Sequence, residues 1–373
     1  MSEIVRTVRL DEREAFERFL ERAYGASWGA FSRWGPDLLR DDEDALQTHL
    51  VLETGGRIAS HVGGYPLPMV MGPARVSAIG VGGVGTDPAL RGKGHMSRLL
   101  EESLARWRER GRTLAGLWGD RQRYGAFGWE ACGLRYTVNL SRRSLERLGL
   151  VAAEIEEVDP RDPHVVFRLT EWHGALPHRI ERRHFALQLR REGVRVFLGP
   201  DGYLLARGDY GDLWVSEVTS PGGREPELIL GGMDRTFAGG ANVEFGPGDR
   251  RRLARVTDAM SGWQVGIQGM WRIVDWPRLL GELQPLLARH ARGLPPFAAC
   301  VGCRWRGETD WGTVEWDGAE VHVAARRSGE GVEVDLPTLT GLLLGSPHPM
   351  PEALGLFARL LPIPVHVPGL DRV

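Results

Sequence analysis

The residues best suited to chemistry lie in a glycine-rich turn between a predicted strand and a predicted helix. Residues 81–84 are a Gly/Val run that predicts a buried strand, and residues 91–94 read Arg-Gly-Lys-Gly. Apolar residues then recur at helical spacing: Leu99, Leu100, Leu104 and Trp107. Because the first N–H groups of a helix have no partners within it, this arrangement predicts an anion site. We expect the anion to be a pyrophosphate.

Two common phosphate-binding loops do not fit this turn. A Walker loop would need glycine where Asp87 stands and Ser or Thr where Gly94 stands. A dinucleotide-binding loop starting at Gly83 would need its third glycine where Pro88 stands, and no alternating βαβ series surrounds it. The pyrophosphate must therefore belong to another kind of ligand.

Other clusters of chemically active side chains are weaker. Cys300 and Cys303 have C-x-x-C spacing, but no second pair completes four ligands, and we expect ordinary buried strand cysteines. His173, His178 and His184 lack the H-E-x-x-H pattern. We expect no metal.

Composition narrows the possible partners. A formal net charge of -2 argues against bulk binding of nucleic acid, which requires a basic field. No apolar run approaches the roughly 20 residues of a membrane span, and residues 1–6 do not resemble the start of a signal peptide. We expect a cytoplasmic protein with neither nucleic acid nor a membrane as its partner.

The elements that must position the turn can be predicted from apolar periodicity. Asp11, with Glu14 three residues later, predicts the start of the first helix, and Gly111 the end of the helix over 94–110. The predicted strands of this first part are 4–10, 48–53, 57–71, 74–86, 114–118 and 135–140. Trp28, Phe31 and Trp34 lie in a loop and either line an acceptor pocket or pack in the core.

The rest of the chain has no second glycine-rich anion turn. A charged helix over 181–191 is expected to present its arginines to solvent. Asp275 predicts the cap of a helix over 276–292, and another helix is expected over 250–260. A buried helix over 336–344 and an apolar tail over 360–373 follow. The predicted strands here are 165–169, 194–198, 203–207, 213–218, 228–230, 298–305, 310–316, 320–325 and 332–336.

Two motifs resemble one protein family. The stretch from Arg91 to Met96, after Val84-Gly-Thr86-Asp-Pro88, resembles the acetyl-coenzyme A loop R/Q-x-x-G-x-G/A of the GNAT acetyltransferases and the V-x-V/T-x-P strand before it. Met96 departs from the small residue usual at the last position, as in the Eis-like branch. Residues 124–129, Tyr-Gly-Ala-Phe-Gly-Trp, also resemble that branch's Y-G-x-F-G-[YF] motif.

The resemblance implies an α+β architecture in three parts. An N-terminal GNAT domain would occupy 1–143, and a second GNAT-like domain without a cofactor loop 144–268. A sterol-carrier-protein-like α/β domain would occupy 269–373. Met270-Trp-Arg-Ile-Val-Asp resembles the M-W-x-R-x-x-D segment that opens the third domain. Family members often form hexamers, so a homo-oligomer is expected.

The resemblance also assigns the donor site. Main-chain groups of Val84, Gly85 and Thr86 would pair with the pantetheine arm of acetyl-CoA. Arg91 or Lys93, the only lysine in the chain, would add charge, although Lys93 could equally be a solvated loop residue. Gly119 and Asp120 would flank the thioester. The pyrophosphate would be held by N–H groups of Gly92, Lys93, Gly94, His95, Met96 and Ser97.

Two groups would carry the acid–base chemistry. Tyr124 would protonate the departing thiolate, since an ordinary tyrosine with a pKa of about 10 is protonated at neutral pH. The carboxylate of Val373 would be the base, although valine replaces the aromatic residue usual at this end in the family. Two alternatives remain: Tyr124 packs the turn before Phe127, and the tail only caps its domain.

The resemblance predicts direct acetyl transfer to an amine in a ternary complex. The acceptor would be an aminoglycoside, a polyamine or a lysine-like amine, and the acidic segment Asp41–Asp44 either attracts cations or is simply solvated. The alternative is a weakly active or inactive binding protein on the same scaffold, with an apolar ligand in its C-terminal domain.

Overall fold

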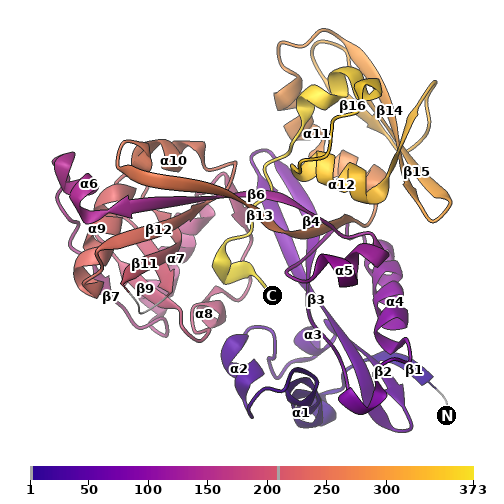
Figure 1. The fold of residues 1–373 in the computed structure, drawn as a ribbon, viewed down its shortest axis with the longest axis horizontal. Coiled ribbons are helices and arrows are strands. Elements are labelled where there is room, and N and C mark those ends of the chain that lie inside the picture. The colour runs from indigo at the N-terminus through magenta and orange to yellow at the C-terminus, as the bar shows by residue number, and fades with distance from the viewer. Residues whose placement is uncertain (1–2, 208–210) are drawn as a thin grey trace. The chain divides into compact units, whose positions relative to one another are not determined.

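The computed structural model describes residues 3–207 and 211–373 (Figure 1). The chain divides into two compact units, each made of separate stretches of sequence. Unit 1 contains the described residues up to Gly133, then Gly269–Ile363 and Val373. Unit 2 contains Leu134–Gln268 and Pro364–Arg372. No helix within the described ranges has both the length and the apolar character needed to cross a bilayer.

The main sheet of unit 1 is mixed, in the order β1-β2-β3-β4-β5-β13. Strands β1 to β4 are joined antiparallel, β4 pairs parallel with β5, and β5 pairs antiparallel with residues 270–273 of β13. These strands are β1 (Glu3–Thr7), β2 (His49–Thr54), β3 (Arg57–Met71), β4 (Ala74–Thr86), β5 (Leu114–Leu117) and β13 (Met260–Ile273). The predicted strands over 57–71 and 74–86 are confirmed.

Two helices pack on this sheet through the faces that their apolar periodicity predicts. Helix α1 (Arg13–Tyr24) buries Phe16, Phe19 and Leu20, and α4 (His95–Glu109) buries Leu99, Leu100 and Trp107. Asp11 is not the cap of α1, so that prediction is wrong. The 3-10 turn η1 (Leu10–Glu12) precedes the helix and contains Asp11, so α1 begins after Glu12, whose carboxylate accepts the N–H of Arg9 at 3.0 Å.

The parting of β4 from β5 creates the space for a ligand. The two strands pair only from Ala78 with Leu114 to Val81 with Leu117, while β4 continues to Thr86. On its other side β4 stays paired with β3 as far as Thr86, with a register shift between the pairs Gly63–Gly82 and His61–Gly85. The last residues of β4 therefore have one edge that β5 does not cover.

A second sheet of unit 1 has the order β16-β15-β14-β17. Its strands are β14 (Phe297–Trp305), β15 (Glu308–Trp316), β16 (Val321–Ala324) and β17 (Val332–Asp335), with helices α11 (Trp276–Ala291) and α12 (Leu336–Leu344). Asp275 caps α11 as predicted, since its carboxylate accepts the N–H of Arg278 at 3.1 Å. Cys300 and Cys303 lie buried on β14, as expected.

The sheet of unit 2 runs β6-β12-β11-β10-β9-β7 (Figure 1). Its strands are β6 (Glu130–Ser141, in this unit from Leu134), β7 (Glu156–Glu157), β9 (Arg195–Leu198), β10 (Tyr203–Arg207), β11 (Asp212–Thr219) and β12 (Gly240–Phe245). The helices are α6 (Arg142–Arg147), α7 (Pro163–Gly174), α8 (Phe185–Gln188), α9 (Glu225–Thr236) and α10 (Arg250–Thr257). The remaining short elements of the chain are α2 (Ala30–Trp34), α3 (Glu43–Leu46), α5 (Arg121–Tyr124), β8 (His178–Ile180), η2 (Pro88–Leu90), η3 (Gly125–Phe127), η4 (Glu352–Leu360) and η5 (Gly369–Asp371).

Two predicted strands are wrong because they lie within helices. Residues 165–169 belong to α7, where the Asp162 carboxylate caps the first turn and Pro163 occupies it. Residues 228–230 belong to α9 and are all buried. A short apolar run is the same for a buried helix as for a strand, so periodicity could not separate them.

The prediction of a solvated arginine face over 181–191 is wrong for Arg182 and Arg191, whereas Arg183 and Arg190 are exposed. Helix α8 covers only Phe185–Gln188, and the side chain of Arg182 is fully buried. Its guanidinium bonds to the carboxylates of Glu217, at 2.6 Å, and Asp371, at 2.7 Å. Buried carboxylates are costly without a cation close by, and the buried guanidinium of Arg182 balances the charge of these two.

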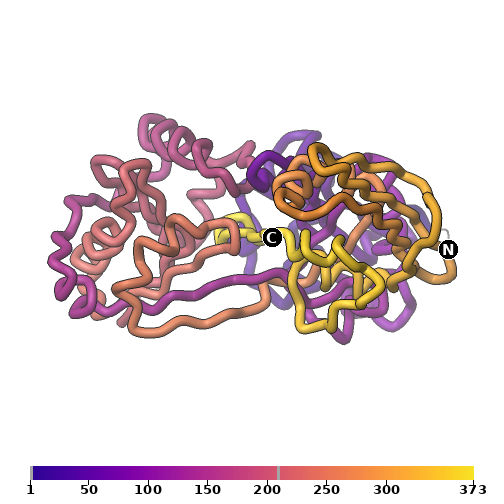
Figure 2. Tube along the Cα trace, turned by 90° about the horizontal axis from the view of Figure 1, so that it is seen from above, coloured from indigo at the N-terminus to yellow at the C-terminus, as the bar shows by residue number. Residues whose placement is uncertain are grey.

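The tail segment 364–372 is held within unit 2 by further polar contacts (Figure 2, yellow). The Arg191 guanidinium donates to the carbonyls of Leu370, at 2.8 Å, and Arg372, at 2.7 Å. The Gln268 amide donates to the carbonyl of Val367 at 2.7 Å. The apolar tail is therefore packed against protein.

Candidate active site

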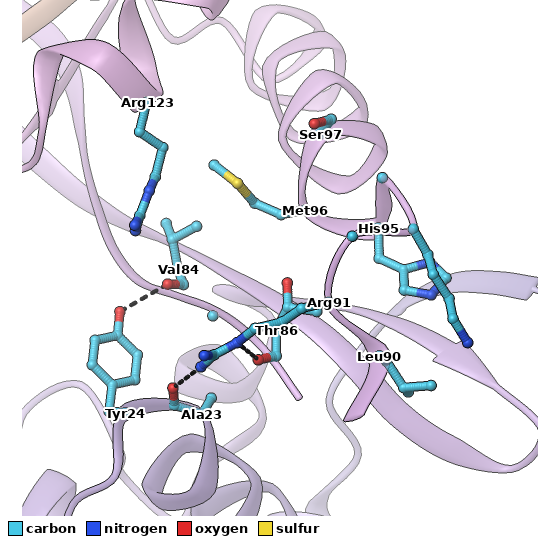
Figure 3. Close-up of a pocket in the computed structure, with 14 residues that line it drawn as sticks. Ala23, Tyr24, Val84, Thr86, Leu90, Arg91, His95, Met96, Ser97 and Arg123 are labelled. Atoms are coloured by element: carbon cyan, nitrogen blue, oxygen red, sulfur yellow. Dashed lines mark hydrogen bonds between the residues drawn. The ribbon is translucent and has the colours of Figure 1, made fainter. Parts of the chain in front are cut away.

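A cavity of about 640 Å³ lies on the uncovered edge of β4 (Figure 3). It is bounded by the end of α1, the end of β4, the turn after β4, the start of α4, and Arg123 of α5. Ten of the twelve residues predicted to bind the donor line it: Val84, Gly85, Thr86, Arg91, Gly92, Lys93, Gly94, His95, Met96 and Ser97. Among the described residues, the lining also includes four that sequence reasoning did not assign to the site: Ala23, Tyr24, Leu90 and Arg123.

The start of helix α4 and the glycine turn before it form one wall of the cavity. Gly92 and Gly94 both have a φ of +78°, which only glycine adopts without strain. A Cβ at either position would meet nothing within 4 Å, so backbone conformation rather than space requires glycine there. The turn aims the first N–H groups of α4 at the cavity, and no side chain caps the helix.

The uncovered edge of β4 presents alternate residues to the cavity. The N–H of Asp87 bonds to the Ala59 carbonyl on β3, and the Gly85 carbonyl accepts the Ser60 hydroxyl at 2.8 Å. The backbone groups of residues 85 and 87 thus face β3. Since successive residues of a strand direct their backbone groups to opposite sides, those of Val84 and Thr86 face the cavity.

Both of those carbonyls have hydrogen-bond donors. The Tyr24 hydroxyl donates to the Val84 carbonyl at 2.9 Å, and Arg91 Nε donates to the Thr86 carbonyl at 3.4 Å. Arg91 also donates to the Ala23 carbonyl at 2.8 Å, so its guanidinium bridges α1 and β4 (Figure 3). Arg91, predicted to add charge at the pyrophosphate, here lies at the strand edge.

Tyr124 follows Arg123 at the end of α5, and its side chain is buried. Gly119, Asp120 and Tyr124 are not among the described residues that line the cavity. Asp120 caps α5 by accepting the N–H of Gln122 at 2.9 Å. A Cβ on Gly119 would come within 2.5 Å of the Tyr124 ring, so these three predicted residues form one tightly packed turn. Burial raises the pKa of Tyr124, while Arg123 opposes the increase. The phenol therefore carries its proton at neutral pH and can donate it.

Val373 lies against the middle of β4. A Cβ on Gly82 would be 2.8 Å from the carboxyl carbon of Val373, and one on Gly80 would be 2.7 Å from its Cγ2. Two glycines of one strand face therefore provide the space for the last residue. Gly82 is two residues before Val84 on β4, and Val373 is not among the described residues that line the cavity.

Comparison with family models finds a match in the first third of the chain. The family model described as "Acetyltransferase (GNAT) domain" matches residues 4–132, which include β1 from Ile4 onward, β2 to β5 and all the described residues of the cavity lining. Residues 4–132 are a GNAT acetyltransferase domain. The chain is thus an acetyltransferase, and acetyl-CoA is its donor.

Solved structures extend the likeness beyond the GNAT domain. A GCN5-related N-acetyltransferase from Kribbella flavida is 19% identical, with a TM-score of 0.69 over 93% of this chain and 89% of that one. A GCN5-related N-acetyltransferase from Anabaena variabilis and Eis1 from Mycobacterium abscessus are each 17% identical, with TM-scores of 0.65 over 92% of this chain and 90% of theirs. At these identities the likeness establishes a shared fold. None of the curated proteins compared with the sequence matches it.

Sequence reasoning missed a buried histidine pair of the GNAT domain. His49 Nδ1 lies 3.1 Å from His61 Nε2, and the outer nitrogens lie 2.9 Å from the Leu38 carbonyl and 2.7 Å from the Gly83 carbonyl. Burial lowers the pKa of His49 to about 4 and that of His61 well below its usual value. The pair thus joins the loop before α3 to the Gly83 bulge of β4.

The lowered pKa values of this histidine pair predict that the protein loses stability in acid. The folded pKa of His49 is lowered, so below about pH 6.5 the unfolded chain binds a proton that the folded chain refuses until about pH 4. The free energy of unfolding should fall across this window by roughly 3 kcal/mol from His49 alone. Urea unfolding between pH 7 and pH 4.5 measures the slope. A His49→Gln variant should have a shallower slope, and an equal slope would contradict the assignment.

Proposed function

We propose that the enzyme transfers acetyl from acetyl-CoA directly to an amine in a ternary complex, with Val373 as base and Tyr124 as acid. The observation that supports this mechanism is the carboxyl group of Val373 at Gly82, on the strand whose last residues would hold the donor. A terminal carboxyl with an ordinary pKa of about 3.3–3.7 is ionised at neutral pH and can accept a proton.

The donor would bind along the cavity in two parts. Main-chain groups of Val84 and Thr86 would pair with the pantetheine arm as a neighbouring strand would, with the Gly85 backbone between them. The N–H groups of residues 92–97 would hold the pyrophosphate, and Lys93 would add charge at its exposed position. Gly119 and Asp120 would flank the thioester through the turn that also fixes Tyr124.

The proposed reaction needs one proton acceptor and one proton donor. The acceptor nitrogen, deprotonated by the Val373 carboxylate, attacks the thioester carbonyl and forms the C–N bond. The C–S bond then breaks, and the phenol of Tyr124 gives its proton to the departing thiolate. Positioning of donor and acceptor supplies much of the rate, and the two proton transfers supply the rest.

The acceptor class is a polar amine: an aminoglycoside, a polyamine or a lysine-like amine. Trp34, the last residue of α2, is 50% exposed, and an ammonium ion can bind to such an indole face. Trp28, in the loop after α1, is 57% exposed and already has the Arg18 guanidinium 5.1 Å from its ring centroid. Asp41 and Asp44 lie nearby in the sequence and are exposed, in keeping with attraction of a cation.

We also propose the family's arrangement for the remainder of the chain. Residues 144–268 would be a second GNAT-like domain, supported by their sheet and covering helices, and 269–373 a sterol-carrier-protein-like domain, supported by the four-stranded sheet with α11 and α12. A hexameric homo-oligomer and a cytoplasmic location, without nucleic acid or membrane partners, stay predictions. Light scattering at several concentrations tests the oligomer.

Thiol release from acetyl-CoA tests the proposed function. The enzyme is mixed with acetyl-CoA and, one at a time, aminoglycosides, polyamines and a lysine peptide. At least one amine should give release that saturates with amine concentration, with mass spectrometry locating the acetyl group on nitrogen. The matched alcohol without an amino group should give only the background rate. Absence of amine-dependent release across the panel would favour a binding protein on this scaffold.

A further inference from the structure

The pantetheine edge of β4 is already filled by the chain's own side chains. The cavity-facing carbonyls, those of Val84 and Thr86, accept from Tyr24 and Arg91 respectively (Figure 3). These are the acceptors that a pantetheine arm would use if it paired with the strand edge. A carbonyl can accept a second bond, but a neighbouring chain and a side chain cannot both occupy the same direction of approach.

The contact with Tyr24 is part of a packed helix end rather than a single side-chain position. A Cβ on Gly85 would come within 3.1 Å of the Ala23 methyl group and 3.3 Å of the Tyr24 ring. The last turn of α1 therefore rests directly on the strand edge. Arg91 fastens the same turn by donating to the Ala23 carbonyl at 2.8 Å.

We propose that Tyr24 and Arg91 close the pantetheine edge in the free enzyme, and that coenzyme A binds by displacing them from Val84 and Thr86. This inference rests on the proposed function, because it requires pantetheine to pair with this edge. The nucleotide half of the ligand binds elsewhere in the cavity, at the start of α4. Closure thus lowers the affinity for the pantetheine half and leaves the affinity for the nucleotide half unchanged.

The position of Tyr24 makes it the better residue to alter. Its side chain is 49% exposed, and its ring packs edge-on against Phe31 with the ring centroids 5.2 Å apart. A Tyr24→Phe variant keeps this ring contact and loses only the hydroxyl that bonds to Val84. It should therefore fold normally while opening one of the two acceptors.

Calorimetric binding of two probes separates the contribution of the pantetheine half of coenzyme A from that of the nucleotide half. Coenzyme A carries both the nucleotide and pantetheine, whereas adenosine 3′,5′-bisphosphate lacks the pantetheine arm. Tyr24→Phe should bind coenzyme A about three- to tenfold more tightly than the wild type, as expected for one competing hydrogen bond, and bind the bisphosphate equally well. Tyr136→Phe, on β6 in unit 2, is the matched control and should change neither Kd.

Arg91→Gln provides a second measurement. Loss of its charge should weaken both probes, but the ratio of the bisphosphate Kd to the coenzyme A Kd should rise, because Thr86 is opened. Unchanged or weaker binding of coenzyme A to Tyr24→Phe, with unchanged bisphosphate binding, would overturn the proposal. Failure of the wild type to bind coenzyme A would instead remove the proposed function, and the closure with it.

Discussion

Adding one glycine after Val373 should lower the turnover number by roughly 10²–10⁴-fold, the usual contribution of a positioned general base. The extra residue moves the carboxylate one residue further along the chain, and a peptide carbonyl, which is not basic, takes its place at Gly82. The measurement is kcat with a saturating accepted amine, with the Kd of coenzyme A as a check that the donor site is intact. Unchanged turnover would remove the terminal carboxylate from the mechanism and leave the tail a packing role.

The variant Gly80→Ala and its double variant with Val373→Ala give a control that does not change the chain length. Gly80→Ala places a methyl group 2.7 Å from Cγ2 of Val373 and should displace the last residue, lowering kcat. Adding Val373→Ala removes Cγ2 but keeps the carboxylate, so the double variant should recover activity. No recovery would show that Gly80→Ala acts through another contact.

Tyr124→Phe should lower kcat by roughly 10²–10³-fold with little change in the KM for acetyl-CoA, because the phenol acts on the leaving group in the transition state. Its raised pKa keeps the proton in place at neutral and mildly alkaline pH, so the wild-type rate should show no loss from this group there. Steady-state kinetics against acetyl-CoA concentration provide the measurement.

A change of leaving group separates acid catalysis from packing. With an acetyl thioester of a more acidic thiol, the thiolate departs without a proton, so the deficit of Tyr124→Phe should shrink. An undiminished deficit would indicate that Tyr124 acts by holding the turn before Phe127. Full turnover of Tyr124→Phe with acetyl-CoA would likewise indicate a packing role for Tyr124.

The elements that carry strong local signals could be predicted from sequence. The glycines at 92 and 94 and the apolar stripe of α4 predict a glycine-rich turn before a helix, and the structure has this turn, which lines the cavity. The Asp275 cap and the long alternating strands β3 and β4 are likewise confirmed. In each case the residues that determine the local structure lie within a few positions of one another.

The site residues missed by sequence reasoning depend on contacts between distant segments. Tyr24 reaches Val84 across 60 positions, and nothing near Tyr24 in the sequence indicates which strand it meets. His49 and His61 appear as isolated strand residues until pairing of β2 with β3 brings their rings together. Arg182 lies in a charged stretch that is typical of a solvated helix. Its burial could not be predicted because its partners, Glu217 and Asp371, are distant in sequence.

The interleaving of the two units has a consequence for how the chain is made. Unit 2 is complete only when residues 364–372 join 134–268, and unit 1 only when 269–363 join the described residues up to Gly133. During synthesis the middle stretch would therefore leave the ribosome roughly a hundred residues before its last segment, a delay of several seconds at 5–20 residues per second. We expect a fragment ending at Gln268 to lack both the Asp371 partner of Arg182 and the strands that complete unit 1, and so to require chaperones or to be degraded.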